Sequence, residues 1–590
     1  MALNNWMRPL RVGLLLAALA AGALGWRQAR GQYDMAMQAM ARTEVQQRAA
    51  SLPAGVAFSL ALPRPVGMGG AAPALGLVNL PGQEGQTGPA VLFLPGAAKT
   101  AGLRAETEAP CLLDGQPLES GQPLTLAEGP HQLHTSEGTL TFTAVYGSAL
   151  PCVFLETASG SLEEIQADKA YSESAAFTLL DAGGGLGYSG WAEAVRGHGN
   201  GSWLDAQKRS YQVTLAQKAG LLDMPSARRW LLIANAFDKS LLRNQTAFAL
   251  AGAAGVAFTP ESRQVELYVN GEYQGCYLLC EKVEVGDGRV DIPSLDKLNL
   301  AAALDAGQAW EEDPALLQSG RRGEPGHRRY TGLEGQPSAG EGGWLLELEL
   351  PERYLEDQKP GFISRLGQPV CIQSPASASR QQVEEIAALY QRLEDALYPT
   401  AEGPAEPLGE LIDLRSFARK YLVEEIVKNL DANMSSQYLY KLPNAVSPRL
   451  YAGPVWDYDK SLAGSGTPWE DLAVIADPEG FWANQQQTGY TLWSALYEQP
   501  AFRAAVEESF WQDFVPAADR LLSEGLVVLE ARRLADSAVM DAMRWQGGGY
   551  PYDPDTFLEE YLAEAERIEA FLAARMEFLK EEWPGPGRGA

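Results

Sequence analysis

Histidine and cysteine are scarce in this chain, which has 590 residues but only 4 His and 5 Cys. So few histidines leave little material for a Ser-His-Asp hydrolase, and neither an HExxH zinc helix, a GxSxG nucleophile turn nor a GxxxxGK[ST] phosphate loop occurs. No CxxC pairs indicate a zinc site. The cysteines are too few for a disulfide framework, although Cys111 and Cys152 bracket a β-rich segment and could pair in an oxidising compartment.

Basic residues are also in deficit, because 47 Lys and Arg stand against 75 Asp and Glu, a formal net charge of -28. No Lys/Arg cluster dominates the chain, which argues against a nucleic-acid partner. An anionic ligand such as ATP would need a local positive site or a metal ion. A basic protein substrate would be attracted more readily than an acidic one.

The apolar run near the N-terminus is shorter than the roughly 20 residues of a membrane-spanning helix. It extends from Val12 to Gly25, follows Arg8 and Arg11, and ends in a small-x-small cleavage pattern. We therefore expect residues 1–30 to be a signal peptide or an uncleaved membrane anchor. The remaining chain is then expected outside the cytoplasm, secreted or held at the membrane of a bacterial cell envelope, with its orientation open.

Composition and periodicity predict an α+β protein with several parts. We expect a stalk or linker over residues 31–109, a small β-sandwich-like module over 110–150, and a main core domain over 151–464. A helical part over 465–583 and a frayed tail over 584–590 follow. Within the core, Asn270-Gly271 predicts a type I′ hairpin turn, residues 221–254 are expected to be rich in helix, and 298–343 to be a long loop or insertion.

Two acidic segments are the strongest candidates for chemistry. Asp431 and Asn433 follow a predicted helix that begins after Asp413. A predicted hairpin then leads to a strand that ends at Asp457 and Asp459. A kinase arranges its catalytic loop and its metal-binding aspartate in this order. From the pattern alone, a purely structural interpretation has the same weight as the catalytic one. In it, Asp431 and Asn433 cap the end of the helix, and Asp457 and Asp459 are turn residues.

A glycine-rich match to GxGxxG occurs at Gly185, Gly187 and Gly190. No helix is predicted to open after it, so we interpret it as a hairpin turn rather than a nucleotide-binding fingerprint.

Several sequence blocks, spread in order over residues 151–464, resemble the CotH kinase family of spore-coat protein H-like atypical protein kinases. The chain departs from the family signature at Gly201, where Ser is usual, and at Arg209, where a second Lys is usual. The blocks are Arg196-Gly197-His198-Gly199-Asn200-Gly201-Ser202-Trp203, Lys208-Arg209-Ser210-Tyr211, Trp230-Leu231-Leu232-Ile233-Ala234-Asn235, Leu241-Leu242-Arg243-Asn244, Leu267-Tyr268-Val269-Asn270-Gly271-Glu272-Tyr273-Gln274-Gly275, Asp431-Ala432-Asn433 and Gly453-Pro454-Val455-Trp456-Asp457-Tyr458-Asp459.

The resemblance implies a divergent two-lobed protein-kinase-like fold that uses ATP with Mg²⁺ or Mn²⁺. It implies Asp431 as the catalytic aspartate and Asp457 as the metal ligand, with Asn433 and Asp459 as further metal contacts. Lys208 is the expected phosphate contact, or alternatively a surface strand lysine. The remaining candidates at the ATP site are Arg196, Asn200 and, as a partner for Lys208, Glu281.

The function implied is transfer of the ATP γ-phosphate to Ser or Thr of a secreted or envelope protein, which is expected to be basic and Ser/Thr-rich. Two alternatives stay open: a kinase-fold scaffold protein that binds without turnover, and an enzyme that transfers AMP.

Overall fold

We analysed a computed structural model of the chain. The structure describes residues 58–65, 68, 72–80, 88–107, 110–136, 138–308, 315–399, 406–464, 473–485, 491–545 and 553–585. The apolar run at residues 12–25, and with it the predicted signal or anchor, lies outside the described residues. Within the described ranges, no helix combines the length and apolar character needed to cross a membrane.

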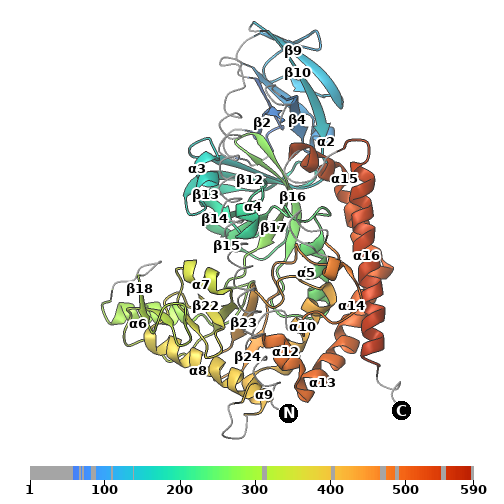
Figure 1. Cartoon of the computed structure of the whole chain (residues 1–590). Helices are drawn as coiled ribbons and strands as arrows, with labels where there is room; N and C mark the ends of the chain where they lie inside the picture. Colours follow the sequence, from blue (N-terminus) through green and yellow to red (C-terminus); the bar gives the residue numbers. More distant parts are fainter. Residues whose placement is uncertain are drawn as a thin grey trace, which may run out of the picture.

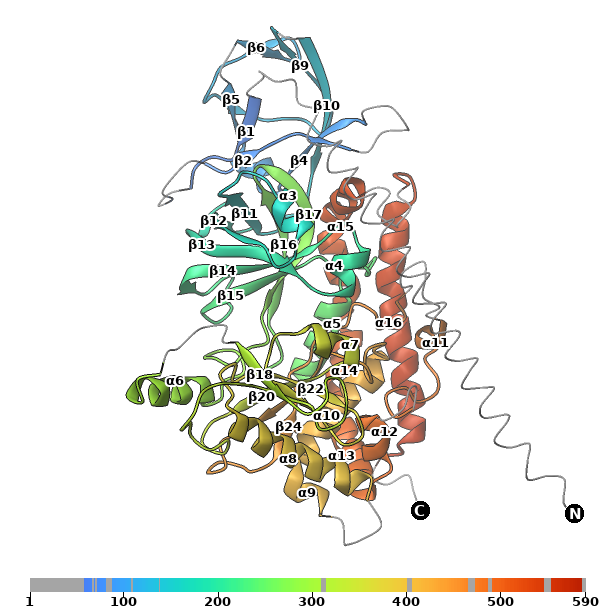
Figure 2. The ribbon, with the colours of Figure 1, turned by 60° about the vertical axis from the view of Figure 1, so that its left-hand side comes forward.

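The molecule is a mixed α+β protein built in three tiers, with an N-terminal β module above a β-barrel and a second large sheet with its helices below (Figure 1). The two last helices, α15 and α16, run along one side of the barrel and the lower helices (Figures 1 and 2). The C-terminal segment thus connects tiers that lie far apart in the sequence.

The N-terminal module holds two sheets, ordered β2-β1-β5-β8 and β3-β4-β10-β9-β6-β7. Strands already occur within residues 58–107, a range that we expected to be stalk or linker. They are needed there because β1 pairs with β5 and β4 pairs in parallel with β10. Cys111 and Cys152 are both buried and are free thiols, so the disulfide considered above is absent. The elements are β1 Phe58–Ala61, β2 Ala74–Leu75, β3 Val78–Asn79, β4 Ala90–Leu94, α2 Ala98–Ala101, β5 Leu103–Thr107, β6 Cys111–Leu113, β7 Gln116–Leu118, β8 Pro123–Leu124, β9 Gly129–Thr135 and β10 Gly138–Tyr146.

The middle tier is a closed barrel with the strand order β11-β12-β13-β14-β15-β17-β16. Its strands and short helices are β11 Cys152–Thr157, α3 Glu163–Ala167, β12 Ser172–Leu180, β13 Leu186–His198, α4 Gly201–Asp205, β14 Ser210–Ala219, β15 Ala227–Ile233, β16 Ser262–Val269 and β17 Glu272–Glu281.

Two turn predictions in the barrel are confirmed. Asn270 and Gly271 have φ of 51° and 81°, as a type I′ turn requires, and they join β16 to β17. The glycine-rich GxGxxG match begins in the β12–β13 hairpin, where the Asp181 carboxylate accepts hydrogen bonds from the backbone N–H groups of Gly183 and Gly185.

The prediction of a helix-rich segment over residues 221–254 is only half correct. Its second half forms α5, Arg243–Ala253, whereas its first half contains β15. Pairing of β15 with β14 and β17 closes this side of the barrel, and Trp230 and Leu232 fill its interior. Tertiary pairing therefore outweighs the local pattern.

The lower tier is a seven-stranded sheet ordered β18-β19-β21-β22-β20-β23-β24. The range 298–343, expected to be a loop or insertion, contains most of α6, the edge strand β18 and its neighbour β19. The elements are α6 Leu295–Asp305, β18 Leu316–Ser319, β19 Arg328–Thr331, β20 Trp344–Leu348, α7 Pro351–Glu356, β21 Gly361–Ile363, β22 Pro369–Ser374, α8 Arg380–Leu397, α9 Leu408–Leu411, α10 Leu414–Val427, β23 Gln437–Lys441 and β24 Leu450–Ala452.

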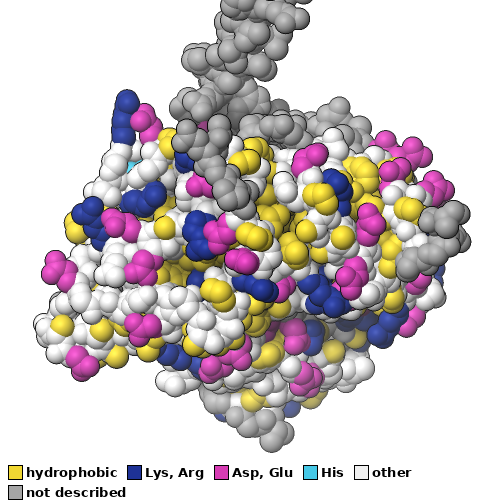
Figure 3. Space-filling model, turned by 90° about the horizontal axis from the view of Figure 1, so that it is seen from below, with side chains coloured by type: hydrophobic (Ala, Val, Ile, Leu, Met, Phe, Trp, Pro, Cys, Tyr) yellow, Lys and Arg dark blue, Asp and Glu magenta, His cyan; other side chains and the backbone are white. Residues whose placement is uncertain are grey.

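The C-terminal helices pack around α10 and against the barrel. They are α11 Ala473–Ala476, α12 Leu492–Tyr497, α13 Pro500–Ser509, the π-helical turn η1 Phe510–Phe514, α14 Val515–Ser523, α15 Leu526–Arg544 and α16 Phe557–Glu582. On the face seen from below, basic and acidic side chains are interspersed among apolar ones (Figure 3).

A fully buried carboxyl group lies where the module, the barrel and α15 meet. Glu266 of β16 accepts a hydrogen bond from the Ser537 hydroxyl of α15 at 2.7 Å, and Ser537 accepts one from the backbone N–H of Ser148 at 2.9 Å. Gly147 has to be glycine here, since a Cβ would lie 1.9 Å from the Glu266 carboxyl oxygen. Burial raises the pKa of Glu266 to about 8.

This burial predicts a pH dependence of stability. A raised pKa in the folded state means that folding favours the protonated carboxyl, so its contribution is complete at acidic pH and is lost as pH rises towards about 8. In the wild type, this carboxyl should lower the free energy of unfolding by about 1.4 kcal/mol per pH unit between about pH 5 and 8. Glu266→Gln should abolish this decrease. Urea unfolding of wild type and variant at pH 5 and pH 8 measures the difference. The exposed Glu163→Gln is the control. If the difference in free energy of unfolding between wild type and Glu266→Gln is the same at both pH values, the assignment is contradicted.

Candidate active site

The two acidic segments lie side by side in the structure. Helix α10 begins at Asp413, whose carboxylate accepts a hydrogen bond from the backbone N–H of Ser416 at 2.9 Å, as predicted. Beyond the end of α10, the backbone N–H of Leu430 donates to the carbonyl of Lys460 at 3.1 Å. The β23–β24 hairpin thus returns the chain so that the loop carrying Asp431 meets the segment carrying Asp457.

The electrostatics of Asp457 follow from this placement. Burial and then the nearby charge of Asp431 raise the pKa of Asp457 well above its usual range. The Ser436 hydroxyl donates to Asp457 at 3.4 Å. Asp457 and Ser436 have φ of 67° and 59°, a left-handed conformation that is uncommon for non-glycine residues and collects at functional sites.

Two fully buried carboxylates on α10 hold both segments in place. Glu424 accepts hydrogen bonds from the Tyr458 hydroxyl at 2.7 Å and from the Asn429 amide at 2.8 Å, and it forms an ion pair with Lys420. It therefore contacts Asn429, two residues before Asp431, and Tyr458, the residue after Asp457. A charge on this buried helix face must be paired, and each pairing fixes a loop.

The neighbouring Glu425 holds a third segment. It forms an ion pair with Arg575 of α16 and accepts the backbone N–H groups of Trp482 and Ala483 at 2.7 and 2.8 Å. The carbonyl of Ala483 in turn accepts a hydrogen bond from the side-chain amide of Asn433 at 3.0 Å. Glu425 thus orients Asn433 through the chain at 482–483.

The signature block at residues 241–244 supports the Asp457 segment from the barrel side. The Asn244 side-chain oxygen accepts the backbone N–H of Tyr458 at 2.7 Å, and the buried Arg243 donates to the carbonyl of Ser461 at 2.9 Å. Arg243 also forms ion pairs with Asp238 and with Glu564 of α16.

The predicted metal ligands fit Mg²⁺ or Mn²⁺ by chemistry. The side-chain oxygen of Asn433 is buried and has no hydrogen-bond partner among the described residues, while its amide nitrogen is held by Ala483. Asp457 and Asp459 add carboxylate oxygens, the donors that these ions prefer. The described part of the chain contains no cluster of three His, Cys, Asp or Glu side chains able to hold a metal ion alone. Such a site suits Mg²⁺, which usually takes one or two protein carboxylates and completes its coordination with phosphate and water oxygens.

A further carboxylate, missed in the sequence, adjoins Asp457. Glu347 of β20 is opposite Tyr438 of β23 in the sheet and accepts hydrogen bonds from the Tyr438 hydroxyl and the Gln373 amide. Burial raises the pKa of Glu347, and its charge adds to that of Asp431 in raising the pKa of Asp457.

Of the predicted ATP-site residues, Arg196 and Asn200 lie at the end of β13 and just beyond it, and both are exposed. The Asn200 side-chain oxygen accepts a hydrogen bond from Lys169 at 2.9 Å. Arg196 is opposite Gln212 of β14.

Lys208 lies in a different environment. Its ammonium group is buried, forms an ion pair with Asp541 of α15 at 2.6 Å and donates to the carbonyl of Cys276 at 2.6 Å. Gly275 makes room for this pair, because a Cβ there would lie 2.3 Å from the Asp541 carboxylate. Lys208 is therefore not a surface strand lysine, and its role as a phosphate contact stays a prediction.

The expected pairing of Lys208 with Glu281 is wrong. Glu281 forms an ion pair with Arg289, and its other carboxylate oxygen accepts the backbone N–H of Glu261 at 2.9 Å. The guanidinium of Arg289 stacks on Trp230 with 4.7 Å to the ring centroid. The partner of Lys208 comes instead from α15, more than 300 residues away in sequence, which no local pattern indicates.

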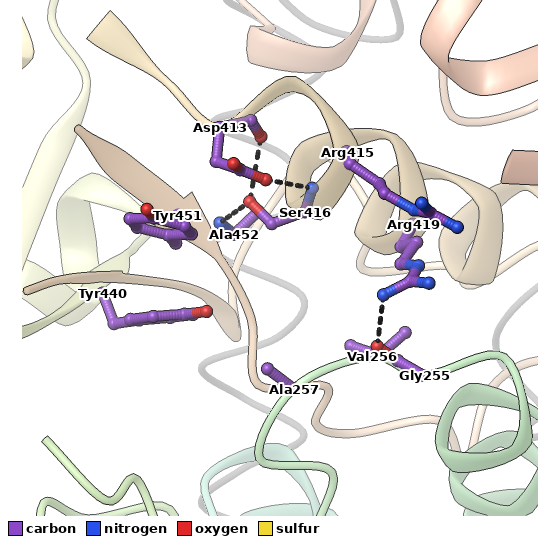
Figure 4. A pocket seen from close by; sticks show the side chains of 10 residues that line it. All are labelled: Gly255, Val256, Ala257, Asp413, Arg415, Ser416, Arg419, Tyr440, Tyr451 and Ala452. Carbon is purple, nitrogen blue, oxygen red and sulfur yellow. Dashed lines mark hydrogen bonds between the residues drawn. The ribbon is translucent and has the colours of Figure 1, made fainter. Parts of the chain in front are cut away.

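A separate pocket of about 170 Å³ opens beside the N-terminus of α10 (Figure 4). Its charged groups are already engaged. Arg419 donates to the carbonyl of Gly255 at 2.8 Å, Arg415 and Arg419 share Asp513, and Asp413 caps α10. None of the predicted site residues lines this pocket.

Fold and site together define an α+β protein in which a helix-end loop and a strand end present paired acidic residues beside a β-barrel. A family model described as CotH kinase protein matches residues 195–579, about two thirds of the chain. The chain belongs to the CotH kinase family, and the resemblance inferred from the sequence is confirmed. Membership indicates a kinase-like, phosphate-transferring function. No match was found among curated proteins.

The Lys208–Asp541 pair gives a prediction that separates a structural from a phosphate-binding role. Lys208→Met leaves Asp541 buried without its partner and should lower the free energy of unfolding by about 3–5 kcal/mol. Lys208→Met combined with Asp541→Leu removes both charges and should recover much of that loss. Urea unfolding measures stability, and calorimetric titration with ATP and Mg²⁺ measures binding. If the stable double variant binds ATP like the wild type, Lys208 acts through structure alone; a selective loss of ATP binding would support phosphate contact.

Proposed function

We propose that this protein is an ATP-dependent protein kinase that transfers the γ-phosphate to Ser or Thr of a secreted or envelope protein. The observation that carries the proposal is the meeting of Asp431 and Asp457, which lie 26 positions apart and are brought together by the β23–β24 hairpin. Phosphate transfer needs one carboxylate for the acceptor hydroxyl and another for the metal that neutralises the phosphates. We further propose that the barrel and the lower sheet with its helices correspond to the two lobes of a divergent protein-kinase-like fold.

In this proposal each residue has one task. Asp431, on the loop after α10, accepts the hydrogen bond of the acceptor hydroxyl and orients its oxygen towards the phosphate. Asp457, Asn433 and Asp459 hold Mg²⁺ or Mn²⁺, which when bound neutralises phosphate charge. Glu424 and Glu425 keep these side chains in position through Tyr458, Asn429 and Ala483. This division agrees with the view that a kinase contributes mainly positioning and charge stabilisation.

We propose a basic, Ser/Thr-rich protein as substrate. Support comes from the formal net charge of -28, which is spread along the chain. A protein with such an excess of acid attracts a cationic chain and repels an acidic one.

The two aspartates should respond differently to substitution. Asp431→Ala should leave Mg²⁺-ATP binding within about twofold of the wild type and lower transfer at least about 100-fold, because its contact is made with the acceptor. Asp457→Ala should lose both Mg²⁺-dependent binding and transfer. Thermal shift with ATP, with and without Mg²⁺, measures binding. Transfer of label from γ-labelled ATP to a generic basic protein measures activity.

The exposed Asp519→Ala on α14 is the matched control and should retain both properties. Label that arrives only from α-labelled ATP would indicate AMP transfer instead. Equal stabilisation by ATP with and without metal would contradict a metal-bridged site. Wild-type labelling that survives both substitutions would falsify the assignment of the two aspartates.

We also propose that the N-terminal segment directs the protein to the membrane or beyond it, with the catalytic part outside the cytoplasm. Its support is the basic, then apolar, order of residues 8–25. Protease added to intact cells should degrade the protein, as judged by immunoblot, while a cytoplasmic marker survives. Full protection of the protein until the cells are lysed would reject this proposal.

A further inference from the structure

Four cationic side chains gather around one histidine at the end of β13. We call Lys169, Arg196, Lys282 and Lys359 the cationic cluster. Burial and the charges of these four residues lower the pKa of His198 to about 3, so the imidazole between them is neutral. The cluster combines residues from the barrel with Lys359, which follows α7 in the lower tier.

Lys282 is the half-buried member of the cluster, at the point where the chain leaves β17 for the lower tier. Its ammonium group donates to the side-chain oxygen of Gln212 at 2.9 Å. Gln212 is the residue opposite Arg196 in the β13–β14 pair. Arg196, Gln212 and Lys282 therefore lie next to one another on one face of the barrel.

One apolar cluster links this face to the candidate active site. Val283, the residue after Lys282, packs against the apolar cluster that contains Tyr438 and Leu345. Trp456, the residue before Asp457, packs against the same cluster. Tyr438 also donates to Glu347, whose charge acts on Asp457. The residue after Lys282 and the residue before Asp457 therefore pack against the same apolar cluster.

The charges of the cluster are only partly compensated by the protein itself: Glu284 acts on Lys282 and Glu356 on Lys169, and Glu284 is already paired with Arg229 at 3.1 Å. Within the described ranges, Lys169, Arg196 and Lys282 form no ion pair at 4.0 Å or less, whereas Lys359 pairs with Asp357 at 3.5 Å. Burial, followed by the charge of Arg229, lowers the pKa of Lys282 to about 7. Gathering like charges at a half-buried position is unfavourable unless an anion joins them. In a chain with such an excess of acid, this arrangement points to a ligand.

We propose that Lys282, together with Arg196, binds the phosphate groups of the nucleotide from the barrel face, opposite the acidic residues that hold the metal. This inference rests on the proposed function and assigns the phosphate contact to a lysine that the sequence motifs did not single out. Lys208, by contrast, already has two anionic or carbonyl partners. A polyphosphate fits between a cationic group and a metal site, because each neutralises a different set of its oxygens.

The test compares Lys282→Met with Lys297→Met, a matched substitution of an exposed lysine on α6. The full chain is titrated by calorimetry with ATP, adenosine and inorganic tripolyphosphate, each with Mg²⁺. Lys282→Met should weaken ATP and tripolyphosphate binding at least about tenfold and leave adenosine within about twofold. Lys282→Arg should keep most of the affinity, and Lys297→Met should match the wild type.

Thermal unfolding of each variant serves as the fold control, and removal of a half-buried charge should not lower the midpoint. Unchanged ATP and tripolyphosphate affinity in Lys282→Met would overturn the proposal, as would an equal loss of ATP and adenosine, which indicates a structural role. Wild type that binds none of the three probes, or that binds polyglutamate more tightly than tripolyphosphate, would also overturn it. Tripolyphosphate binding that depends on Lys282 without any phosphate transfer would sustain this site and count against the proposed function alone.

Discussion

The arrangement of the candidate active site depends on the pairing of two adjacent buried carboxylates on α10. Glu424 reaches the Asp431 loop through Asn429 and the Asp457 segment through Tyr458, whereas Glu425 fixes residues 482–483 and, through Ala483, the amide of Asn433. A buried carboxylate without partners is strongly unfavourable, so each of these loops has to adopt the position that satisfies it. Because these buried charges must be paired, helix α10 fixes the positions of three separate segments.

This constraint also explains why the C-terminal helices are part of the site although they carry none of its proposed catalytic groups. Arg575 of α16 neutralises Glu425, and Glu564 of the same helix pairs with Arg243, which holds the carbonyl of Ser461. Asp541 of the neighbouring helix α15 likewise neutralises Lys208. Each helix therefore supplies the charge that a signature residue of the core lacks, which agrees with a family match that extends to residue 579.

Local signals in the sequence were sufficient for several elements. Asn270-Gly271 specified its hairpin, Asp413 its helix start, and the order of helix, acidic loop, hairpin and acidic strand end brought Asp431 to Asp457. Predictions failed where distant partners decide. β15 is a strand because two other strands flank it, and Lys208 has its partner on α15, far away in the sequence. Glu281 pairs instead with the nearby Arg289, in the segment after β17. One available signal was overlooked: Lys420 and Glu424 share the apolar face of α10 with Phe417 and Tyr421, and charges on such a face need partners.

The two lysines, Lys208 and Lys282, illustrate how environment separates residues of identical chemistry. Lys208 is enclosed by Asp541, the carbonyl of Cys276 and the ring of Tyr277, so an incoming anion would have to displace a short ion pair to reach it. Among the described residues, Lys282 forms no ion pair and donates to the neutral oxygen of Gln212. Its charged neighbours are the cations Arg229, Lys359 and Arg196 and the acidic Glu284, so an anion there would relieve repulsion without breaking an ion pair of Lys282. We therefore expect the free energy of binding an anion to be more favourable at Lys282, although the motif containing Lys208 is the more conspicuous in the sequence. In a protein with so large an excess of acid, a lysine that forms no ion pair within the described residues is a stronger indication of the proposed phosphate site than a lysine within a signature.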